Sequence, residues 1–379
     1  MTSTTRALWI GTYPHPASGG AEGVWRVELD TARGSFLGGA LVAASPSPSF
    51  LALAGDTLYA VGESERGTLA AFAVGPDGGL APRGGEVATG GSFPCHVVAD
   101  GDEVLVANYG DGVLSVVPVA ADGAPGAAVR HQPHSGSGPD AERQEGPHAH
   151  FVAPLANLGA ADDGSGDVLV VDLGTDELRR HDPDAPEGNP PRVVATFPPG
   201  TGPRHLVALP SGHLVVVGEL DPALFVLAPV TAADGTTAYD VVARHDVTRA
   251  AAPDGSPGFP SHVALGADGT RVLAAVRGPD VLAVHAVEPG ADGGAPVLRH
   301  LGDTPVGGTW PRHFAVLGAD PAAPDHDLVV VANQDDHEEA AAGDGPTSNL
   351  ALLRVAREDG SGTVLDVLAL PAPACVVEA

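Results

Sequence analysis

The chain repeats a pattern of two short apolar stretches joined by a polar turn. Each copy opens with a proline and a few apolar residues, passes a Gly or Asp turn, and ends in a second apolar stretch closed by a polar residue. The stretches are short and lack helical periodicity, so they predict β-strands. Six copies occur, beginning at Pro48, Pro94, Pro147, Pro203, Pro260 and Pro311.

The spacing of these prolines predicts the architecture. Successive prolines lie 46, 53, 56, 57 and 51 residues apart, and a repeat of about 50 residues built from short strands is typical of a four-stranded propeller blade. The segment from Ala7 to Asp30 matches the middle of a repeat without its first strand, so a C-terminal strand must complete a seventh blade. Thr363 to Leu370 and Ala374 to Val377 are the candidates for that strand. We therefore predict an all-β, seven-bladed β-propeller with four-stranded blades, closed by pairing of N- and C-terminal strands, as one domain over residues 1–379.

Two segments interrupt the repeat. Residues from Ala120 to Gly146 and from Asp335 to Ser348 carry no strand pattern, and we interpret both as loops. The second is rich in acidic residues, Ala and Gly, a composition that favours disorder, and no function is expected for it.

Charge and composition exclude some of the functions that the chain could have. A net charge of -29 argues against binding to nucleic acid or to an anionic membrane surface, because both require a cationic face. No stretch approaches the roughly 20 apolar residues of a membrane helix, and Met1 to Thr12 lacks the regions of a signal peptide. We expect a cytoplasmic protein with reduced cysteines, as a monomer or weak homodimer.

The basic residues exclude several chemistries. All 19 are Arg, so neither a Schiff-base lysine nor a phosphate-loop lysine is present. The sequence also lacks the G-x-S-x-G, H-E-x-x-H, C-x-x-C and G-x-G-x-x-G motifs. No common catalytic signature accounts for this chain.

Polar residues at equivalent points of the repeats are the candidate site. The first strand of each propeller blade lines the central channel, so residues that follow the prolines should converge. The position after the proline holds Cys95, His148, Arg204, Ser261 and Arg312, and the next holds His96, Ala149, His205, His262 and His313. The second strands end in Thr12, Glu63, Asn108, Asp172, Glu219, Arg277 and Asn333.

Among these positions, residues that recur from repeat to repeat are expected to have structural roles. The recurring histidines His96, His205, His262 and His313 are expected to bond the backbone of the neighbouring blade. Asn108, Asp172 and Asn333 are expected to form turns, and Cys95 is expected to pack in the core. The residues without such a repeated counterpart are the better functional candidates, and these are His148, Arg204, Glu219, Arg277 and Arg312.

The arginines indicate the kind of ligand. Three of them in one ring would repel a metal cation, so neither a metal ion nor another cofactor is expected. Guanidinium groups bind phosphate and carboxylate through paired hydrogen bonds. We therefore expect a small organic anion as the substrate.

Several motifs carry a resemblance to a known family. The segments RQEGPHAHF (Arg143 to Phe151), GTGPRHL (Gly200 to Leu206), VVGEL (Val216 to Leu220), VRGPD (Val276 to Asp280) and WPRHF (Trp310 to Phe314) resemble the lactonase family of seven-bladed propellers. That family includes bacterial 6-phosphogluconolactonase and fungal carboxymuconate cyclase. The resemblance implies site roles for His148, Arg204, Glu219 and Arg277, and Arg312 is a further candidate from its position.

The resulting hypothesis is a lactonase that opens an anionic sugar lactone such as 6-phosphogluconolactone. Glu219 or His148 would deprotonate water, and Arg277 would stabilise the oxyanion. Arg204 with Arg312 would hold the phosphate or carboxylate, and His150 would orient the base. Two alternatives stay open at this point: a lactonizing cycloisomerase acting on a muconate-type diacid, and a non-catalytic propeller that binds a ligand or protein.

Overall fold

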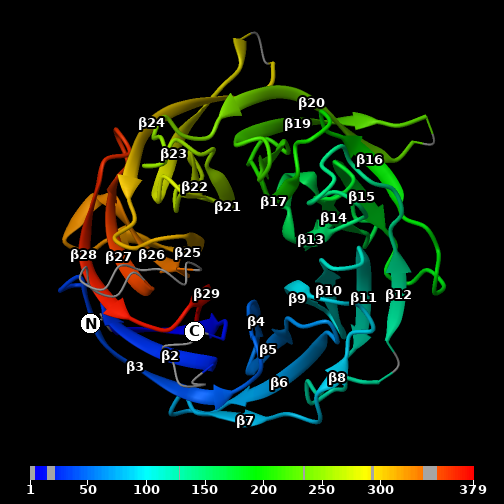
Figure 1. Cartoon of the computed structure of the whole chain (residues 1–379), viewed down its shortest axis with the longest axis horizontal. Helices are drawn as coiled ribbons and strands as arrows, with labels where there is room; N and C mark the ends of the chain where they lie inside the picture. The colour runs from blue at the N-terminus through cyan, green and yellow to red at the C-terminus, as the bar shows by residue number, and fades with distance from the viewer. Residues whose placement is uncertain (1–4, 15–21, 128, 234, 292–293, 336–347) are drawn as a thin grey trace. The chain divides into compact units, whose positions relative to one another are not determined.

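The computed structural model describes residues 5–14, 22–127, 129–233, 235–291, 294–335 and 348–379. Within these ranges the strands form seven antiparallel sheets, and the helices named are short 3-10 helices, η2 (Leu155–Asn157) and η3 (Gly159–Ala161). Both helices lie in the extended turn that follows the third proline-led strand. The predicted seven-bladed β-propeller of four-stranded blades is therefore confirmed (Figure 1).

The chain divides into two compact units. The larger unit comprises residues 52–245 and 289–296, and the smaller comprises residues 1–51, 246–288 and 297–379. The expectation of one domain over residues 1–379 stays a prediction.

The larger unit holds four blades. Its strands are β4 (Leu51–Ala54), β5 (Thr57–Gly62), β6 (Thr68–Val74), β7 (Leu80–Pro82), β8 (Val87–Ala88), β9 (Pro94–Asp100), β10 (Glu103–Asn108), β11 (Val113–Pro118), β12 (Arg130–Pro133), β13 (Ala149–Pro154), β14 (Val168–Asp172), β15 (Glu177–His181), β16 (Arg192–Thr196), β17 (Pro203–Ala208), β18 (Leu214–Gly218), β19 (Ala223–Thr231) and β20 (Thr237–Asp246). In the first of these blades β7 and β8 both pair with β6, so the outermost strand is split.

The smaller unit holds three blades. Its strands are β1 (Thr5–Thr12), β2 (Gly23–Asp30), β3 (Ser35–Ala44), β21 (Phe259–Leu265), β22 (Arg271–Arg277), β23 (Val281–Glu288), β24 (Val297–Pro305), β25 (Pro311–Asp320), β26 (Ala323–Asn333), β27 (Asn349–Ala356), β28 (Gly362–Ala369) and β29 (Pro373–Glu378).

Closure of the chain occurs inside this smaller unit. β29 pairs with β1 in the sheet ordered β29-β1-β2-β3, where the two terminal strands lie side by side (Figure 1). Of the two predicted closing segments, Ala374 to Val377 is therefore the right one. The other, Thr363 to Leu370, is wrong as a closing strand because it is the outermost strand of the blade β25-β26-β27-β28. The predicted loop from Asp335 to Ser348 lies mostly outside the described residues.

The core of each unit lies between neighbouring sheets. In the larger unit, Phe225 of β19 is fully buried against apolar residues of the preceding blade, among them Leu169 and Phe197. In the smaller unit, Ile10 and Leu328 belong to one buried cluster. A blade that lies between two others is covered on both faces by its neighbours, so its strands need apolar residues on both faces. This explains the nearly continuous apolar runs of the sequence.

A bulge recurs at the start of the inner strands. In β9, β13, β17 and β25 the ladder register shifts by one residue, and the bulged residues are Cys95, His150, Arg204 and Arg312. Bulges re-aim side chains near functional sites.

The residue before the inner strand often takes a left-handed conformation. At Gly202, with φ 55°, an added Cβ would lie 2.5 Å from the Leu220 side chain.

Candidate functional site

A buried carboxylate bridged by two arginines lies at the centre of the larger unit's polar cluster. Glu219, 4% exposed, follows β18, and its Oε2 is 2.8 Å from Nε of Arg204. Its Oε1 accepts a hydrogen bond of 2.5 Å from Nη2 of Arg143. Arg204 is 2% exposed, whereas the Arg143 side chain is 37% exposed. Two positive charges therefore flank one negative charge.

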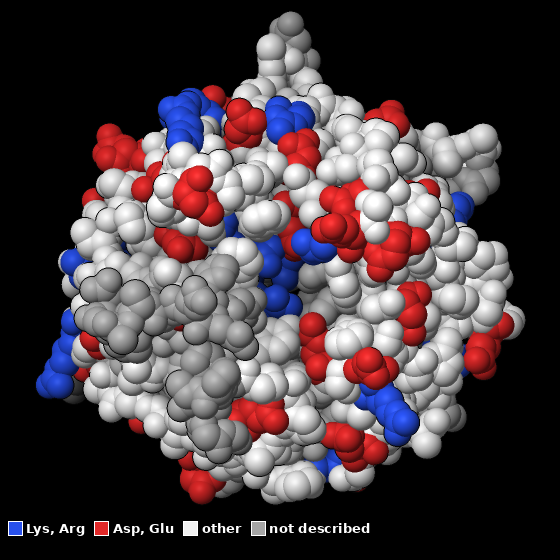
Figure 2. Space-filling model, in the orientation of Figure 1, with Lys and Arg blue, Asp and Glu red and all other residues white. Residues whose placement is uncertain are grey.

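This local excess of positive charge contrasts with the rest of the surface. Figure 2 shows acidic side chains spread widely over the visible face. Burial alone would lower the pKa of Arg143, but the attraction and hydrogen bond of the Glu219 carboxylate outweigh it and raise that pKa above its usual range. Arginine side chains stay protonated in proteins, so both guanidiniums carry a positive charge.

A series of hydrogen bonds explains why both arginines reach the same carboxylate. Gln144, fully buried, donates through Nε2 to the carbonyl of Leu173 and to Oδ1 of Asp176, each at 2.8 Å. Oδ1 of Asp176 also accepts the backbone N–H of Gly202 at 2.8 Å. The Gly202 carbonyl in turn accepts the N–H of Glu219 at 2.8 Å. One hydrogen-bonded chain therefore fixes the segments that carry Arg143, Arg204 and Glu219.

His148 lies beside this cluster with a defined tautomer. Its Nδ1 is 2.7 Å from the carbonyl oxygen of Tyr109, and a carbonyl only accepts, so Nδ1 carries the proton. In the neutral ring Nε2 is then the basic nitrogen, and it lies 3.4 Å from Oε2 of Glu145. Backbone hydrogen bonding and the nearby His148 lower the pKa of Glu145. This carboxylate is therefore ionised.

Aromatic rings connect His148 to the other candidates. The rings of Tyr109 and His148 are stacked, with centroids 4.4 Å apart and an interplanar angle of 16°. The centroid of His150 lies 5.7 Å from that of Tyr109 and 5.3 Å from that of His205. The structure thus brings together four of the six predicted residues: His148, His150, Arg204 and Glu219.

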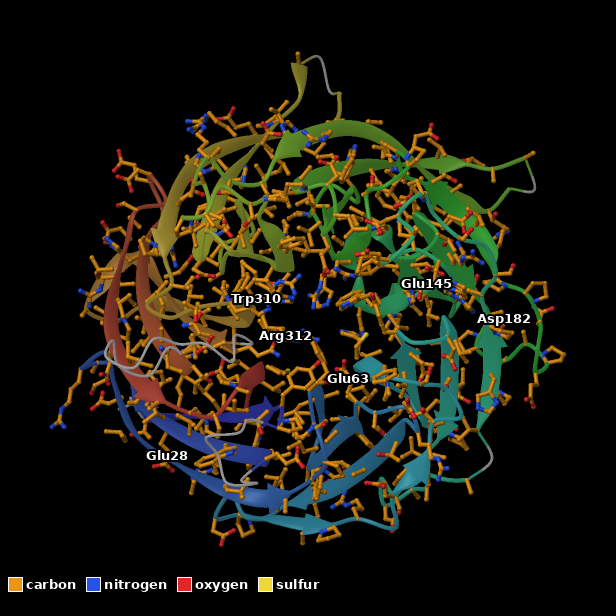
Figure 3. The ribbon with its side chains drawn as sticks, in the orientation of Figure 1. Glu28, Glu63, Glu145, Asp182, Trp310 and Arg312 are labelled. Atoms are coloured by element: carbon orange, nitrogen blue, oxygen red, sulfur yellow. The ribbon has the colours of Figure 1, made fainter. Side chains whose placement is uncertain are left out.

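The other two predicted residues belong to the smaller unit. Arg277 donates to the carbonyls of Phe259 and Pro260 at 2.9 and 3.3 Å, and its guanidinium carbon lies 5.3 Å from the centroid of Trp310. Arg312 donates to the Tyr13 hydroxyl at 2.6 Å. Trp310 and Arg312 lie close together at the start of β25 (Figure 3). The site roles of Arg277 and Arg312 stay predictions.

The ladder registers correct two alignments made from the sequence. His150, not His148, is the equivalent of Arg204 and Arg312, because Ala149 pairs with the last residue of β14 as Pro203 pairs with that of β18. Asn108, Asp172 and Asn333 pair with Pro94, Ala149 and Pro311, and they are therefore the equivalents of Gly218 rather than of Glu219. In the blade that begins with β13, the proline Pro147 lies two residues before the paired position, whereas Pro203 occupies that position itself. Both motifs contain a proline and a histidine, and this similarity concealed the difference in spacing.

Two residues of the cluster were not among the predicted ones. Arg143 comes from the interrupting loop, where no strand register places it, although the motif RQEGPHAHF contains it. Tyr109 follows Asn108 as Glu219 follows Gly218, so the corrected register would have found it. Both contact residues that the sequence had singled out.

The structural roles expected for repeated residues are partly confirmed. Nδ1 of His96 accepts the backbone N–H of Val152, and Nδ1 of His313 accepts that of Val376, both at 3.3 Å. Each bond joins a histidine to the neighbouring blade. The same role stays a prediction for His205 and His262. Cys95 is buried, as expected of a core residue.

A series of buried polar side chains, in contact with one another, supports the backbone of His148. Asp172, fully buried, accepts the backbone N–H of His148 at 2.8 Å through Oδ1 and contacts Nδ1 of His134 at 2.5 Å through Oδ2. Nε2 of His134 lies 2.9 Å from Nε2 of His181. Burial lowers the pKa of His134, although Asp172 opposes this. Burial, with repulsion from His134 and Arg179, lowers the pKa of His181 further.

These depressed pKa values predict acid destabilisation. The unfolded chain binds protons at both histidines near the ordinary pKa of 6.5, whereas the folded chain binds them only at lower pH. This stability is therefore fully present above pH 6.5 and is lost as the pH falls below it. Urea unfolding should show a loss of about 1–2 kcal/mol between about pH 6.5 and 5.5. A His181→Gln variant should show a flatter profile; an equally steep one would contradict the assignment.

In the part of the chain that the structure describes, no three or more His, Cys, Asp or Glu side chains are placed to hold a metal ion. None of the helices described is long and apolar enough to cross a membrane.

Comparisons with known proteins point in one direction. A family model described as lactonase, 7-bladed β-propeller, matches residues 7–365. The 6-phosphogluconolactonase of Bacillus subtilis (strain 168) is 30% identical over 382 residues, covering 97% of each chain. Among solved structures, the periplasmic gluconolactonase PpgL of Pseudomonas aeruginosa is 28% identical with a TM-score of 0.77, covering 99% of each chain. A protein from Lactobacillus plantarum is 27% identical with a TM-score of 0.77 and the same coverage.

Proposed function

This chain belongs to the lactonase family of seven-bladed β-propellers, and from that premise we propose that it is a lactone hydrolase acting on a phosphorylated sugar lactone. The observation that carries the proposal is the Glu219 carboxylate held between Arg143 and Arg204. His148 is joined to this group through the rings of Tyr109, His150 and His205, the last of which bonds Arg204. A similar chain from Bacillus subtilis carries the name 6-phosphogluconolactonase. Paired guanidiniums suit a phosphate group.

His148 is the general base in this proposal. Glu219 faces two guanidiniums, which stabilise its ionised form and make it a weak base. Nε2 of His148 is the basic nitrogen of the neutral ring, and the ionised Glu145 stabilises the imidazolium that forms. We therefore assign proton removal to His148 and the orientation of both arginines to Glu219.

The proposed reaction is hydrolysis of the lactone's ester bond by water. A water oxygen bonds to the carbonyl carbon while its proton passes to Nε2 of His148. The carbonyl oxygen becomes an oxyanion, which a guanidinium stabilises. The ring C–O bond then breaks, and the proton returns from His148 to the leaving oxygen, producing a hydroxy acid. Arg143, the more exposed arginine, binds the substrate's phosphate.

The test follows proton release as the acid forms. Purified protein should hydrolyse 6-phosphogluconolactone faster than unphosphorylated gluconolactone, above the spontaneous rate. His148→Gln should lower kcat by about 10²- to 10⁴-fold. His213→Gln, which alters a histidine of the turn before β18 that contacts Ser211, is the matched control and should keep wild-type kinetics.

Three results would contradict the proposal. Unchanged kcat in His148→Gln would exclude the base assignment. Turnover of carboxymuconate but of neither lactone would indicate the cycloisomerase, and turnover of none would indicate a ligand-binding propeller. Arg277→Ala and Arg312→Ala in the same assay test the oxyanion and anion-binding roles predicted for those residues from the sequence.

A cytoplasmic location and the absence of a nucleic-acid or membrane partner stay predictions, as does a monomeric or weakly dimeric state. The name of the similar Pseudomonas aeruginosa protein places that protein in the periplasm. Fractionation of the native cells would test the location.

A further inference from the structure

Gln334 occupies, in the blade that begins with β25, the position that Glu219 occupies in the blade that begins with β17. In both blades the last residue of the second strand pairs with the proline that opens the first strand. Gln334 and Glu219 are each the next residue along the chain. The bulged arginines Arg312 and Arg204 each follow the opening proline. The Arg312–Gln334 pair is therefore the equivalent of the Arg204–Glu219 pair.

The same backbone hydrogen bonds hold the two pairs. The residue before each opening proline has a left-handed backbone, with φ 55° at Gly202 and φ 61° at Trp310. Its N–H is accepted by an aspartate Oδ1, at 2.8 Å for Asp176 in the first case and 2.9 Å for Asp280 in the second. Its carbonyl accepts the N–H of the glutamate at 2.8 Å or of the glutamine at 3.0 Å. The two blades therefore match in backbone and differ here in side chain.

The two pairs differ in charge. Oε2 of Glu219 lies 2.8 Å from Nε of Arg204, so a carboxylate faces that guanidinium. Arg312 instead donates through Nη1 to Oε1 of Gln334 at 3.4 Å and through Nη2 to the Tyr13 hydroxyl at 2.6 Å. Its Cζ lies 4.9 Å from the centroid of the Tyr13 ring. An amide, a hydroxyl and an aromatic face position a guanidinium without cancelling its charge.

Different residues give the two positions the same charge. In the larger unit a second guanidinium, that of Arg143, lies 2.5 Å from Oε1 of Glu219, so the two arginines and the glutamate together carry one net positive charge. In the smaller unit Arg312 and the neutral Gln334 carry the same net charge as a pair. A carboxylate in place of Gln334 would cancel the charge of that pair.

We propose that Gln334 is a specificity-determining residue, which leaves the charge of Arg312 available to an anionic group of the substrate. The proposal rests on the proposed function and deepens it, because it assigns the preference for a phosphorylated lactone in part to one neutral side chain. Gln334 is 4% exposed, and charges interact most strongly where water is excluded. A carboxylate at this position would therefore pair with Arg312 and repel the phosphate.

The first test adds the charge that the other blade has. Gln334→Glu should raise the ratio of KM for 6-phosphogluconolactone to KM for gluconolactone by about 10-fold or more. The ratio is measured because a general loss of activity would affect both lactones equally. An unchanged ratio would overturn the proposal.

Two controls isolate the effect of charge. Gln334→Met keeps the length of the side chain without a charge, and it should change the ratio by less than about 2-fold, because the hydrogen bond that it removes is long. Thr363→Glu adds the same charge to an exposed position of β28, the outermost strand of the same blade, where salt screens it. It should keep the wild-type ratio. A rise in Gln334→Met equal to that in Gln334→Glu would overturn the proposal.

A second variant keeps the test decisive where Gln334→Glu does not fold. Arg312→Gln removes the positive charge itself and should raise KM for 6-phosphogluconolactone by about 10-fold or more, the usual effect of losing a charged hydrogen bond. An unchanged KM in this variant would show that Arg312 binds no anionic group, and the role of Gln334 would fail with it.

A binding measurement distinguishes this inference from the proposed function. Calorimetry with 6-phosphogluconate should show a Kd about 10-fold or more higher in Gln334→Glu than in the wild type. If the wild type hydrolyses lactone but Gln334→Glu changes neither the Kd nor the KM ratio, the inference fails and the function stands. If no lactone is hydrolysed, the function fails, and the raised Kd still supports the inference. An unchanged Kd, or no binding by the wild type, then overturns it.

Discussion

Glu219→Ala is expected to lower the free energy of unfolding by about 3–5 kcal/mol, the usual cost of removing one partner from a buried ion pair. Arg204, 2% exposed, loses the carboxylate that lies 2.8 Å from its Nε. Arg143 loses the same carboxylate, and the two guanidiniums then repel each other. Lactone hydrolysis should fall about 100-fold or more, because misaligned groups lose effective concentration. Urea unfolding and proton release measure the two effects.

Phosphate provides a rescue that a merely damaged fold would not show. Without Glu219, the two guanidiniums can bind an anion in place of the lost carboxylate. Phosphate at about 100 times its Kd should restore about 2.7 kcal/mol to Glu219→Ala. Glu103→Gln is the matched control: its partner Arg130 is a third exposed, so this pair should contribute about 1 kcal/mol or less and need no phosphate. Stability that ignores phosphate would contradict the two-arginine site.

The propeller could be predicted because its information is local and repeated. A proline, an apolar stretch and a turn recur about every 50 residues, and each signal lies inside one strand pair. The closing strand was harder to choose, because Thr363 to Leu370 and Ala374 to Val377 have similar apolar patterns. Only pairing with β1, a contact between the two ends of the chain, separates them.

The candidate site was predictable where strands carry it and not where a loop does. Arg204 and Glu219 lie next to the ladder of β17 and β18, so the repeat located them. Arg143 is placed by Gln144 and Asp176, whose hydrogen bonds join segments about 30 residues apart. No periodic pattern encodes such bonds. Tyr109 was missed for a smaller reason, a one-residue offset in the alignment of strand ends.

Asp172→Ala is expected to be the most damaging single substitution beneath the site, since the carboxylate is fully buried. Oδ1 accepts the backbone N–H groups of His148, Gly174 and Thr175 at 2.8, 3.0 and 3.1 Å. Burial raises its pKa, but the bonds from His134 and the backbone outweigh this and lower it. Each buried donor left without its acceptor costs about 1–3 kcal/mol. The loss should therefore reach about 4 kcal/mol or more, which urea unfolding measures.

Asp172→Asn separates the effect on His148 from the effect on folding. The amide oxygen can still accept the three backbone N–H groups, but the amide nitrogen faces Nδ1–H of His134, so about 2–3 kcal/mol should be lost. A neutral amide oxygen accepts the backbone N–H of His148 more weakly than a carboxylate does, so His148 should be held less firmly and kcat should fall by about 10-fold or more. Asp320→Asn is the matched control, since Asp320 is 1% exposed, binds Arg354 and accepts the N–H of Ala322 at 2.7 Å. It should lose comparable stability with unchanged kcat; an equal fall in kcat would show that Asp172 acts only through global stability.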